Sequence, residues 1–187
     1  SVTYVQQSDD FTVRVTYVGH STFRLDTPGG IAIATDFTGE AGKGILPDEV
    51  TMHHAHSTHF TLYPAPKIEH ELRGWGKEGA PAKHFLTVAD TLIRNVTTDI
   101  NSNFAGYAPD GNSIFIFETA GRCIGHLGHL HHLLTEGHYA QIGRLDILMV
   151  PVDGGLTMGL DPMIKVVKRL NASVVLPVHW FSGYSLT

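Results

Sequence analysis

The chain has 187 residues, a formal net charge of −5 at pH 7 and 42% hydrophobic residues. This length and composition predict one folded domain, residues 1–187, and exclude a disordered chain. The acidic balance without a basic stripe argues against a nucleic-acid partner, and no apolar run approaches the roughly 20 residues of a membrane-spanning helix.

The bulk features leave the compartment undecided. Cys123 is the only cysteine, so no internal disulfide can form, and we expect it to be a small buried hydrophobe. The sequence begins at Ser1, so a targeting segment could have been removed. Cytoplasmic and periplasmic locations both stay open, as does the oligomeric state.

The N-terminal third predicts short strands joined by tight turns. Apolar and polar residues alternate over 13–17 and again over 23–25, and Pro28-Gly29-Gly30 is a turn signal before the apolar run 31–36. A further strand at 49–52 leads directly into a group of histidines. The period-2 alternation indicates strands with one buried face.

The rest of the chain predicts more strands and few helices. Residues 60–90 carry many Pro and Gly residues and predict a long, irregular loop that could wall a pocket. A weak helical pattern covers 132–142, and Asp161 as N-cap with Pro162 starts a clear amphipathic helix to Leu170. Expected strands follow the apolar runs at 91–96, 113–119, 122–125, 147–150 and 172–177.

Histidines are concentrated between residues 53 and 59. This segment holds four of the thirteen histidines of the chain. His54 and His56 are two residues apart, so on an extended backbone both rings point the same way and can converge on one ion. His53 points to the opposite side, and His59 reaches a neighbouring position.

A second histidine-rich segment, Gly125-His126-Leu127-Gly128-His129-Leu130-His131-His132, follows a predicted strand. Asp153 and His179 each end a buried strand, where a charge or an imidazole needs a partner. A single histidine is more often a surface or hydrogen-bonded residue than a ligand. We place His70, His84 and His138 in that class.

The order of these segments resembles that of the metallo-β-lactamase fold superfamily, in the branch of small metal-dependent hydrolases similar to ascorbate-phosphate lactonase. The resemblance covers nearly the whole chain and implies an α+β fold, an αββα sandwich of two mixed sheets with helices outside. The matching segments are Tyr17-Val-Gly-His20-Ser-Thr-Phe23, 31–36, His54-x-His56-x-x-His59, 125–128, Val150-Pro-Val-Asp153-Gly and Pro177-Val-His179-Trp180.

The resemblance also implies a site. His54 and His56 would hold one ion and His59 and His179 another, with His126, His129 and Asp153 forming or lining the centre. His20 and Asp36 would support it, Asp36 by a hydrogen bond to a ligand imidazole.

The chain departs from the family pattern at three points. Thr58, expected in the pocket wall, stands where the family has Asp, and His129 stands where the family has a metal-bridging Asp. The family's third histidine has no evident counterpart, although Asp99 or His126 could substitute. Each missing carboxylate removes a negative charge that would offset the repulsion between two neighbouring cations. One bound ion is therefore expected more than two.

The expected cofactor is therefore Zn²⁺, as one or two ions, with Mn²⁺ or Fe²⁺ also compatible. The resemblance implies a hydrolase that acts on a small ester, lactone or phosphate-containing substrate through a metal-bound hydroxide. The alternative is a non-catalytic metal-binding or sensory module on the same fold. RNA processing is disfavoured by the acidic charge. The family commonly extends further beyond its last histidine than the eight residues found here, so a C-terminal element could be missing.

Overall fold

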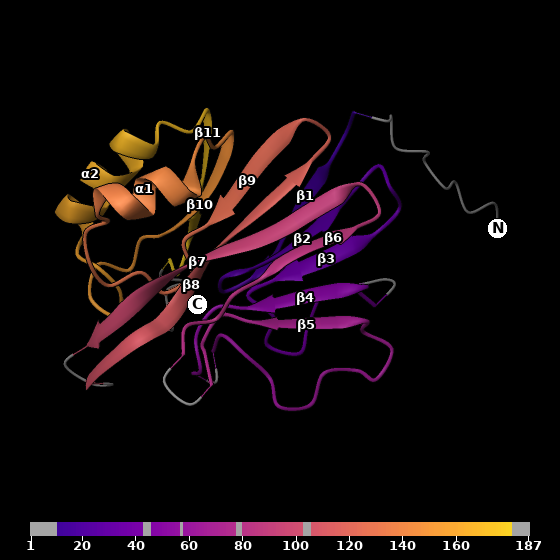
Figure 1. Ribbon diagram of the computed structural model, residues 1–187, viewed down its shortest axis with the longest axis horizontal. Coiled ribbons are helices and arrows are strands. Elements are labelled where there is room, and N and C mark those ends of the chain that lie inside the picture. The colour runs from indigo at the N-terminus through magenta and orange to yellow at the C-terminus, as the bar shows by residue number, and fades with distance from the viewer. Residues whose placement is uncertain (1–10, 43–45, 57, 78–79, 103–105, 181–187) are drawn as a thin grey trace.

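A computed structural model describes residues 11–42, 46–56, 58–77, 80–102 and 106–180, and in this part of the chain two β-sheets lie face to face (Figure 1). Sheet A has the strand order β1-β2-β3-β4-β5, and sheet B has the order β11-β10-β9-β8-β7-β6. Sheet A contains β1 (Arg14–Gly19), β2 (Thr22–Asp26), β3 (Ala32–Thr35), β4 (Glu49–Met52) and β5 (His70–Arg73). Sheet B contains β6 (Phe85–Val88), β7 (Thr91–Ser102), β8 (Gly106–Thr119), β9 (Arg122–His126), β10 (Ile147–Pro151) and β11 (Val174–Val178).

Both sheets are mixed. In sheet A, β1, β2 and β3 are antiparallel neighbours, whereas β3, β4 and β5 run parallel. In sheet B, β6 to β9 are antiparallel and β9, β10 and β11 are parallel. The expected α+β sandwich of two mixed sheets is confirmed.

The space between the sheets is filled by apolar side chains from both. Leu25 and Ile33 of sheet A pack with Phe115, Phe117 and other residues of sheet B in one fully buried cluster. At about 25 cal/mol per Å² of apolar surface removed from water, this cluster is the main force that holds the two sheets together. The ends of the strands are therefore held in place by a packed core.

The two helices of the described chain lie against the outer face of sheet B (Figure 1). They are α1 (Glu136–Ile142) and α2 (Leu160–Leu170). Ile142, Met163 and Val166 face the strands, as the apolar stripe of the sequence predicts. However, α2 begins earlier than expected: its N-cap is Gly159, and Asp161 lies in the first turn.

The outer face of sheet A is covered mainly by irregular chain. Phe37, Val50 and Met52 are buried there beneath Phe60 and Trp75. The loop expected over 60–90 is thus largely present, but it is interrupted by β5 and β6. Each of these strands has four residues, too few for a period-2 pattern to stand out among prolines and glycines.

The strand directions bring distant segments to one edge of the sandwich. Segments that follow β4, β9 and β11 leave the carboxyl ends of these strands, and the β1–β2 turn joins them through the His179 amide, which donates to the His20 carbonyl at 3.3 Å. All four segments carry histidine. No helix in the described ranges is long and apolar enough to cross a lipid bilayer.

Candidate metal centre

Imidazole rings from four segments gather at this edge. His59 and His129 have ring centroids 4.5 Å apart, His59 and His179 are 4.8 Å apart, and His54 and His129 are 5.3 Å apart. The complete group is His20, His54, His56, His59, His129, His131 and His179. We call it the histidine cluster.

Three members of the cluster present their donor atoms to one point. One ring nitrogen each of His20, His59 and His179 lies within 4.8 Å of the other two. His59 is fully buried and His179 is 2% exposed. Three imidazoles with a remaining open position are the ligand set of one class of catalytic zinc sites.

Asp36 fixes the orientation of His59. The His59 Nδ1–H donates to the Asp36 carboxylate at 2.6 Å, which leaves Nε2 as the nitrogen with a lone pair. Asp36 is fully buried and also accepts from the Ser21 hydroxyl. Burial alone would raise the pKa of Asp36, but the facing imidazoles of His59 and His53 hold that pKa well below its usual range. The carboxylate is therefore ionised when it orients the ligand.

His54 and His56 are oriented in the same way. His54 Nδ1–H donates to the Gly111 carbonyl at 2.8 Å, and His56 Nδ1 is hydrogen-bonded to the Thr58 hydroxyl at 2.9 Å. Their rings lie nearly parallel, 5° apart, with centroids 6.2 Å from each other. Thr58, where the family pattern has Asp, thus supports His56.

Burial keeps His54, His129 and His179 neutral. It lowers the pKa of His179 to about 3, with help from the neighbouring His59 and His20, and lowers the pKa of His54 to about 4. Burial also lowers the pKa of His129. Neutral imidazole is the form that binds a cation, so these three rings need not release a proton to bind one at pH 7.

Several buried ring nitrogens of the cluster have no hydrogen-bond partner among the described residues. They are His59 Nε2, His129 Nδ1, His131 Nε2 and His179 Nε2. A buried polar atom without a partner costs about 1–3 kcal/mol. For His59 and His179, whose donor atoms converge with that of His20, a bound cation would supply the missing partner.

The backbone is strained at the same place. His20, Asp36 and His179 have φ angles of 51°, 57° and 55°, in the left-handed region that residues with a Cβ rarely adopt. Such conformations cost about 1–3 kcal/mol each and collect at functional sites. The strain turns these side chains toward the edge that the cluster occupies.

The structure does not bring His126 into the histidine cluster. His126 is fully buried; its Nε2–H donates to the Ser21 carbonyl at 2.8 Å and its Nδ1 accepts from the Gly128 amide at 2.9 Å. Its ring lies 4.3 Å from that of His53. With both nitrogens engaged, His126 has none left for a cation.

His53 is a structural residue, as its position opposite His54 indicates. Its Nδ1–H donates to the Ser113 carbonyl at 2.8 Å, and its Nε2 accepts from the Thr35 hydroxyl at 2.9 Å. Gly128 packs on this ring: a Cβ there would lie 2.5 Å from His53 Nδ1, and its φ is +60°. Gly128 therefore serves close packing on His53.

The two other predicted carboxylates, Asp99 and Asp153, both accept hydrogen bonds from their own surroundings, and Asp153 also lies close enough to His131 and His179 for its charge to oppose the lowering of their pKa by burial. Asp153 accepts from the amides of Leu156 and Thr157, which shapes the loop after β10. Asp99 lies on β7, where it accepts from the Asp110 amide and the Tyr107 hydroxyl. Neither is among the three residues whose donor atoms converge.

His131 is the member of the cluster that our sequence analysis did not single out. Its ring lies 4.9 Å from that of His129, two residues earlier. The same i, i+2 spacing that singles out His54 and His56 also relates His129 to His131, and this signal could have identified it.

The chain matches the beta-lactamase superfamily domain over residues 14–179 and belongs to this family. A UPF0173 metal-dependent hydrolase from Methanospirillum hungatei is 27% identical over 183 residues, with 90% of this chain and 83% of the relative covered.

Solved structures share the architecture. A candidate Zn-dependent hydrolase of the metallo-β-lactamase superfamily from Thermotoga maritima superposes with a TM-score of 0.70 at 29% identity, covering 93% of this chain and 79% of that one. A candidate metal-dependent hydrolase from Parabacteroides distasonis superposes with a TM-score of 0.69 at 15% identity, over 92% and 84% of the two chains, and shows the fold alone.

Proposed function

We propose that the chain is a metal-dependent hydrolase that acts on a small ester, lactone or phosphate-containing molecule, with its cation held by His20, His59 and His179. The observation that carries this proposal is the convergence of three imidazole donors within 4.8 Å at the edge of the sandwich. The metal dependence of the similar proteins from Methanospirillum hungatei and Thermotoga maritima supports the same function.

The residues present fit a divalent cation. The ring nitrogens of His59 and His179 are buried without a partner among the described residues, and burial keeps the His179 imidazole neutral. When bound, a divalent cation supplies Lewis-acid chemistry, polarising a carbonyl or phosphoryl oxygen and lowering the pKa of a water molecule. The all-imidazole donor set favours Zn²⁺; Fe²⁺ also binds imidazole, while Mn²⁺ prefers sites with more oxygen ligands.

The surrounding residues orient this set. Asp36 holds His59 in the tautomer whose Nε2 faces the centre. His54 and His56 lie on its more exposed side, where a substrate would enter, and the Gly111 carbonyl and the Thr58 hydroxyl fix their rings. A small molecule is the expected substrate because the net charge of −5 does not favour a nucleic acid.

A single cation is the proposed occupancy. Two cations a few Å apart repel strongly unless carboxylates lie between them. Here His129 stands in the middle of the cluster, in ring contact with His54, His59, His131 and His179. A neutral imidazole at that position supplies no negative charge, so a second ion is disfavoured.

Metal analysis and a hydrolysis panel test the proposal together. Protein purified without chelator should retain about one tightly held ion per chain and hydrolyse at least one member of a set of esters, lactones and phosphodiesters. Both properties should be lost in the double variant His59→Ala/His179→Ala and kept in the control His138→Ala, whose ring contacts His132 and caps α1.

The outcomes separate the two readings of the site. One bound ion with no turnover on any substrate would favour a non-catalytic metal-binding module on the same fold. No retained ion would refute the metal centre itself. Two tightly held ions would refute the single-ion form of the proposal.

A further inference from the structure

A second candidate binding site lies beside the carboxyl end of β5. A cavity of about 490 Å³ opens here, which is within the size range of small-molecule sites. Its walls are formed by Glu71, Arg73, Trp75, Lys77 and His84, with Pro81 at the side. We call it the Arg73–Lys77 pocket.

The charged groups of this pocket favour an anion. Arg73 pairs with Glu71 at 3.3 Å, and both side chains are partly exposed. Lys77 forms no ion pair among the described residues. Two cations against one carboxylate give a local positive charge on a chain whose net charge is −5. Trp75 adds a flat apolar wall on which a ring can pack.

The floor of the pocket is held by hydrogen bonds. His84 Nε2–H donates to the Arg73 carbonyl at 2.7 Å, and Asn95 donates to the Ala82 carbonyl at 3.0 Å. Asn95 also donates to the Ser113 hydroxyl, which in turn donates to the Gly74 carbonyl at 2.6 Å. A floor fixed in this way does not have to be ordered when a ligand binds.

The pocket lies beside segments that also carry histidines of the cluster. Trp75 packs edge-to-face on Phe60, with ring centroids 5.4 Å apart, and Phe60 directly follows His59. On the other side, Arg73 pairs in register with Met52, two residues before His54. These two links connect the pocket to the chain segments that hold His54 and His59.

We propose that the Arg73–Lys77 pocket binds the anionic group, carboxylate or phosphate, of a small organic molecule. As a statement about the substrate this rests on the proposed function: the hydrolysed bond lies at the histidine cluster and the charged end in this pocket. The guanidinium and the ammonium bind the anionic oxygens, and Trp75 packs against the adjoining carbon skeleton.

Calorimetric titration of the full chain with inorganic phosphate and with benzoate tests the proposal, with metal loaded and after chelation. We expect one anion to bind in both states, and to change the fluorescence of Trp75, measured as the difference between the wild type and Trp75→Phe. Arg73→Gln and Lys77→Gln should each weaken binding by about tenfold, the effect of one lost charge-assisted hydrogen bond.

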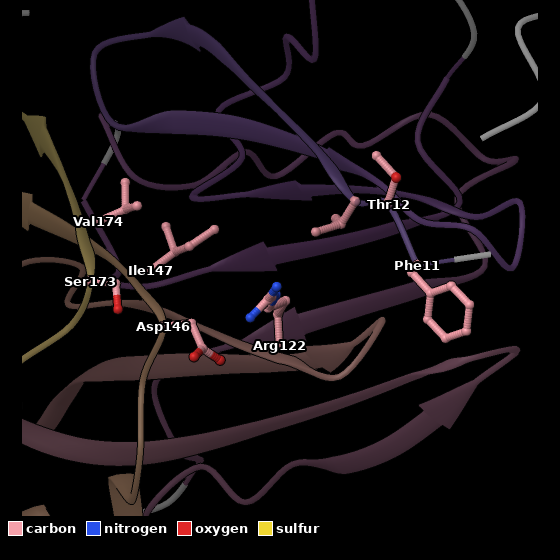
Figure 2. Close-up of a pocket in the computed structure, with 8 residues that line it drawn as sticks. Phe11, Thr12, Arg122, Asp146, Ile147, Ser173 and Val174 are labelled. Carbon is pink, nitrogen blue, oxygen red and sulfur yellow. The ribbon is translucent and has the colours of Figure 1, made fainter. Parts of the chain in front are cut away.

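Arg122→Gln is the matched control, because it removes the same charge from another cavity. Arg122 lines a cavity with Ile147 and Val174 at the amino ends of β9, β10 and β11 (Figure 2). Its substitution should leave the affinity for either anion unchanged. An equal loss of anion affinity in Arg122→Gln would show that the effect comes from the change in net charge alone, and would overturn the proposal.

The remaining outcomes distinguish this pocket from the metal centre. Anion binding that disappears on chelation would place the anion on the cation and refute the pocket. Absence of binding by both probes would also refute it, while leaving the proposed hydrolase intact. If the protein cannot be loaded with metal and yet binds the anion, the metal centre is refuted and the pocket stands. A preference for phosphate over benzoate identifies the anionic group.

Discussion

Two groups of histidines lie next to each other in this protein and differ in whether their ring nitrogens are hydrogen-bonded. His53 and His126 form a buried pair in which all four ring nitrogens are hydrogen-bonded to neighbouring groups. In the histidine cluster, His59 is as deeply buried, but its Nε2 has no partner among the described residues. A structural histidine therefore differs from a candidate ligand in whether its second ring nitrogen has a hydrogen-bond partner, and not in burial or crowding.

The difference also follows from backbone direction. His53 continues β4 and points inward between the sheets, whereas His54 begins the segment that leaves the strand and turns outward. One residue of displacement along an extended chain reverses the direction of the side chain. Adjacent histidines therefore reach two different environments, and substitutions can test this separation.

The largest expected effect is loss of a ligand from the converging set. His179→Ala should lower the affinity for Zn²⁺ by more than about 100-fold, the upper end of the loss caused by removing an orienting partner. The measurement is competition with a calibrated chelator. Zn²⁺ affinity within a factor of about three of the wild type would contradict the assignment of His179.

A smaller loss is expected when the orienting carboxylate is changed. Asp36→Asn should lower Zn²⁺ affinity by about 10–100-fold, because the amide no longer fixes the His59 tautomer by a charged hydrogen bond. Asp36→Glu, which keeps the charge but displaces it, serves as the comparison. Unaltered affinity in Asp36→Asn would show that the hydrogen bond at 2.6 Å does not orient a ligand.

For the structural pair, a loss of stability is expected in place of a loss of Zn²⁺ affinity. His53→Leu should destabilise the fold by about 2 kcal/mol, because the Ser113 carbonyl and the Thr35 hydroxyl lose their buried partner. Urea unfolding measures this loss. Zn²⁺ affinity should fall far less than in His179→Ala, and a comparable fall would end the distinction between the two groups.

The smallest effect concerns a third environment, the His70–Glu49 ion pair at 2.8 Å. The hydrogen bond to Glu49 raises the pKa of His70, so the pair stabilises the fold fully below the unfolded value of about 6.5, and this stabilisation is lost as the pH rises through the folded value. Burial raises the pKa of Glu49.

Since His70 is partly exposed, about 1 kcal/mol is the expected size of this contribution. Urea unfolding at pH 6 and pH 9 should show that the wild type loses stability relative to His70→Gln as the pH rises. If the stability of the two proteins changed with pH in parallel, the His70–Glu49 ion pair would have no role in stability.

The sequence predicts the fold better than the ligand set. Alternation, turn residues and apolar runs identify β1 to β4 and β7 to β11, and the resemblance carried by 17–23, 54–59 and 177–180 indicates the two-sheet architecture. The sequence does not predict β5 and β6, because each has only four residues and these lie among prolines and glycines. The N-cap of α2 is Gly159, two residues before Asp161, and its carbonyl accepts from the Met163 amide.

The ligand set depends on contacts that no local pattern contains. His20 supports the site by resemblance, yet its place beside His59 and His179 depends on a left-handed backbone in the β1–β2 turn. His126 matches a motif, but the Ser21 carbonyl and the Gly128 amide engage its ring. Both facts arise from the packing of segments more than 100 residues apart in sequence.

The position of His179 immediately after the last strand has a consequence for assembly. Two of the three converging imidazoles lie in the first third of the chain, and the third arrives only when β11 has paired with β10. During synthesis the emerging polypeptide therefore lacks a complete binding site until β11 and His179 have been made. A bound ion would then link the β1–β2 turn to the segment after β11 and protect that strand from fraying.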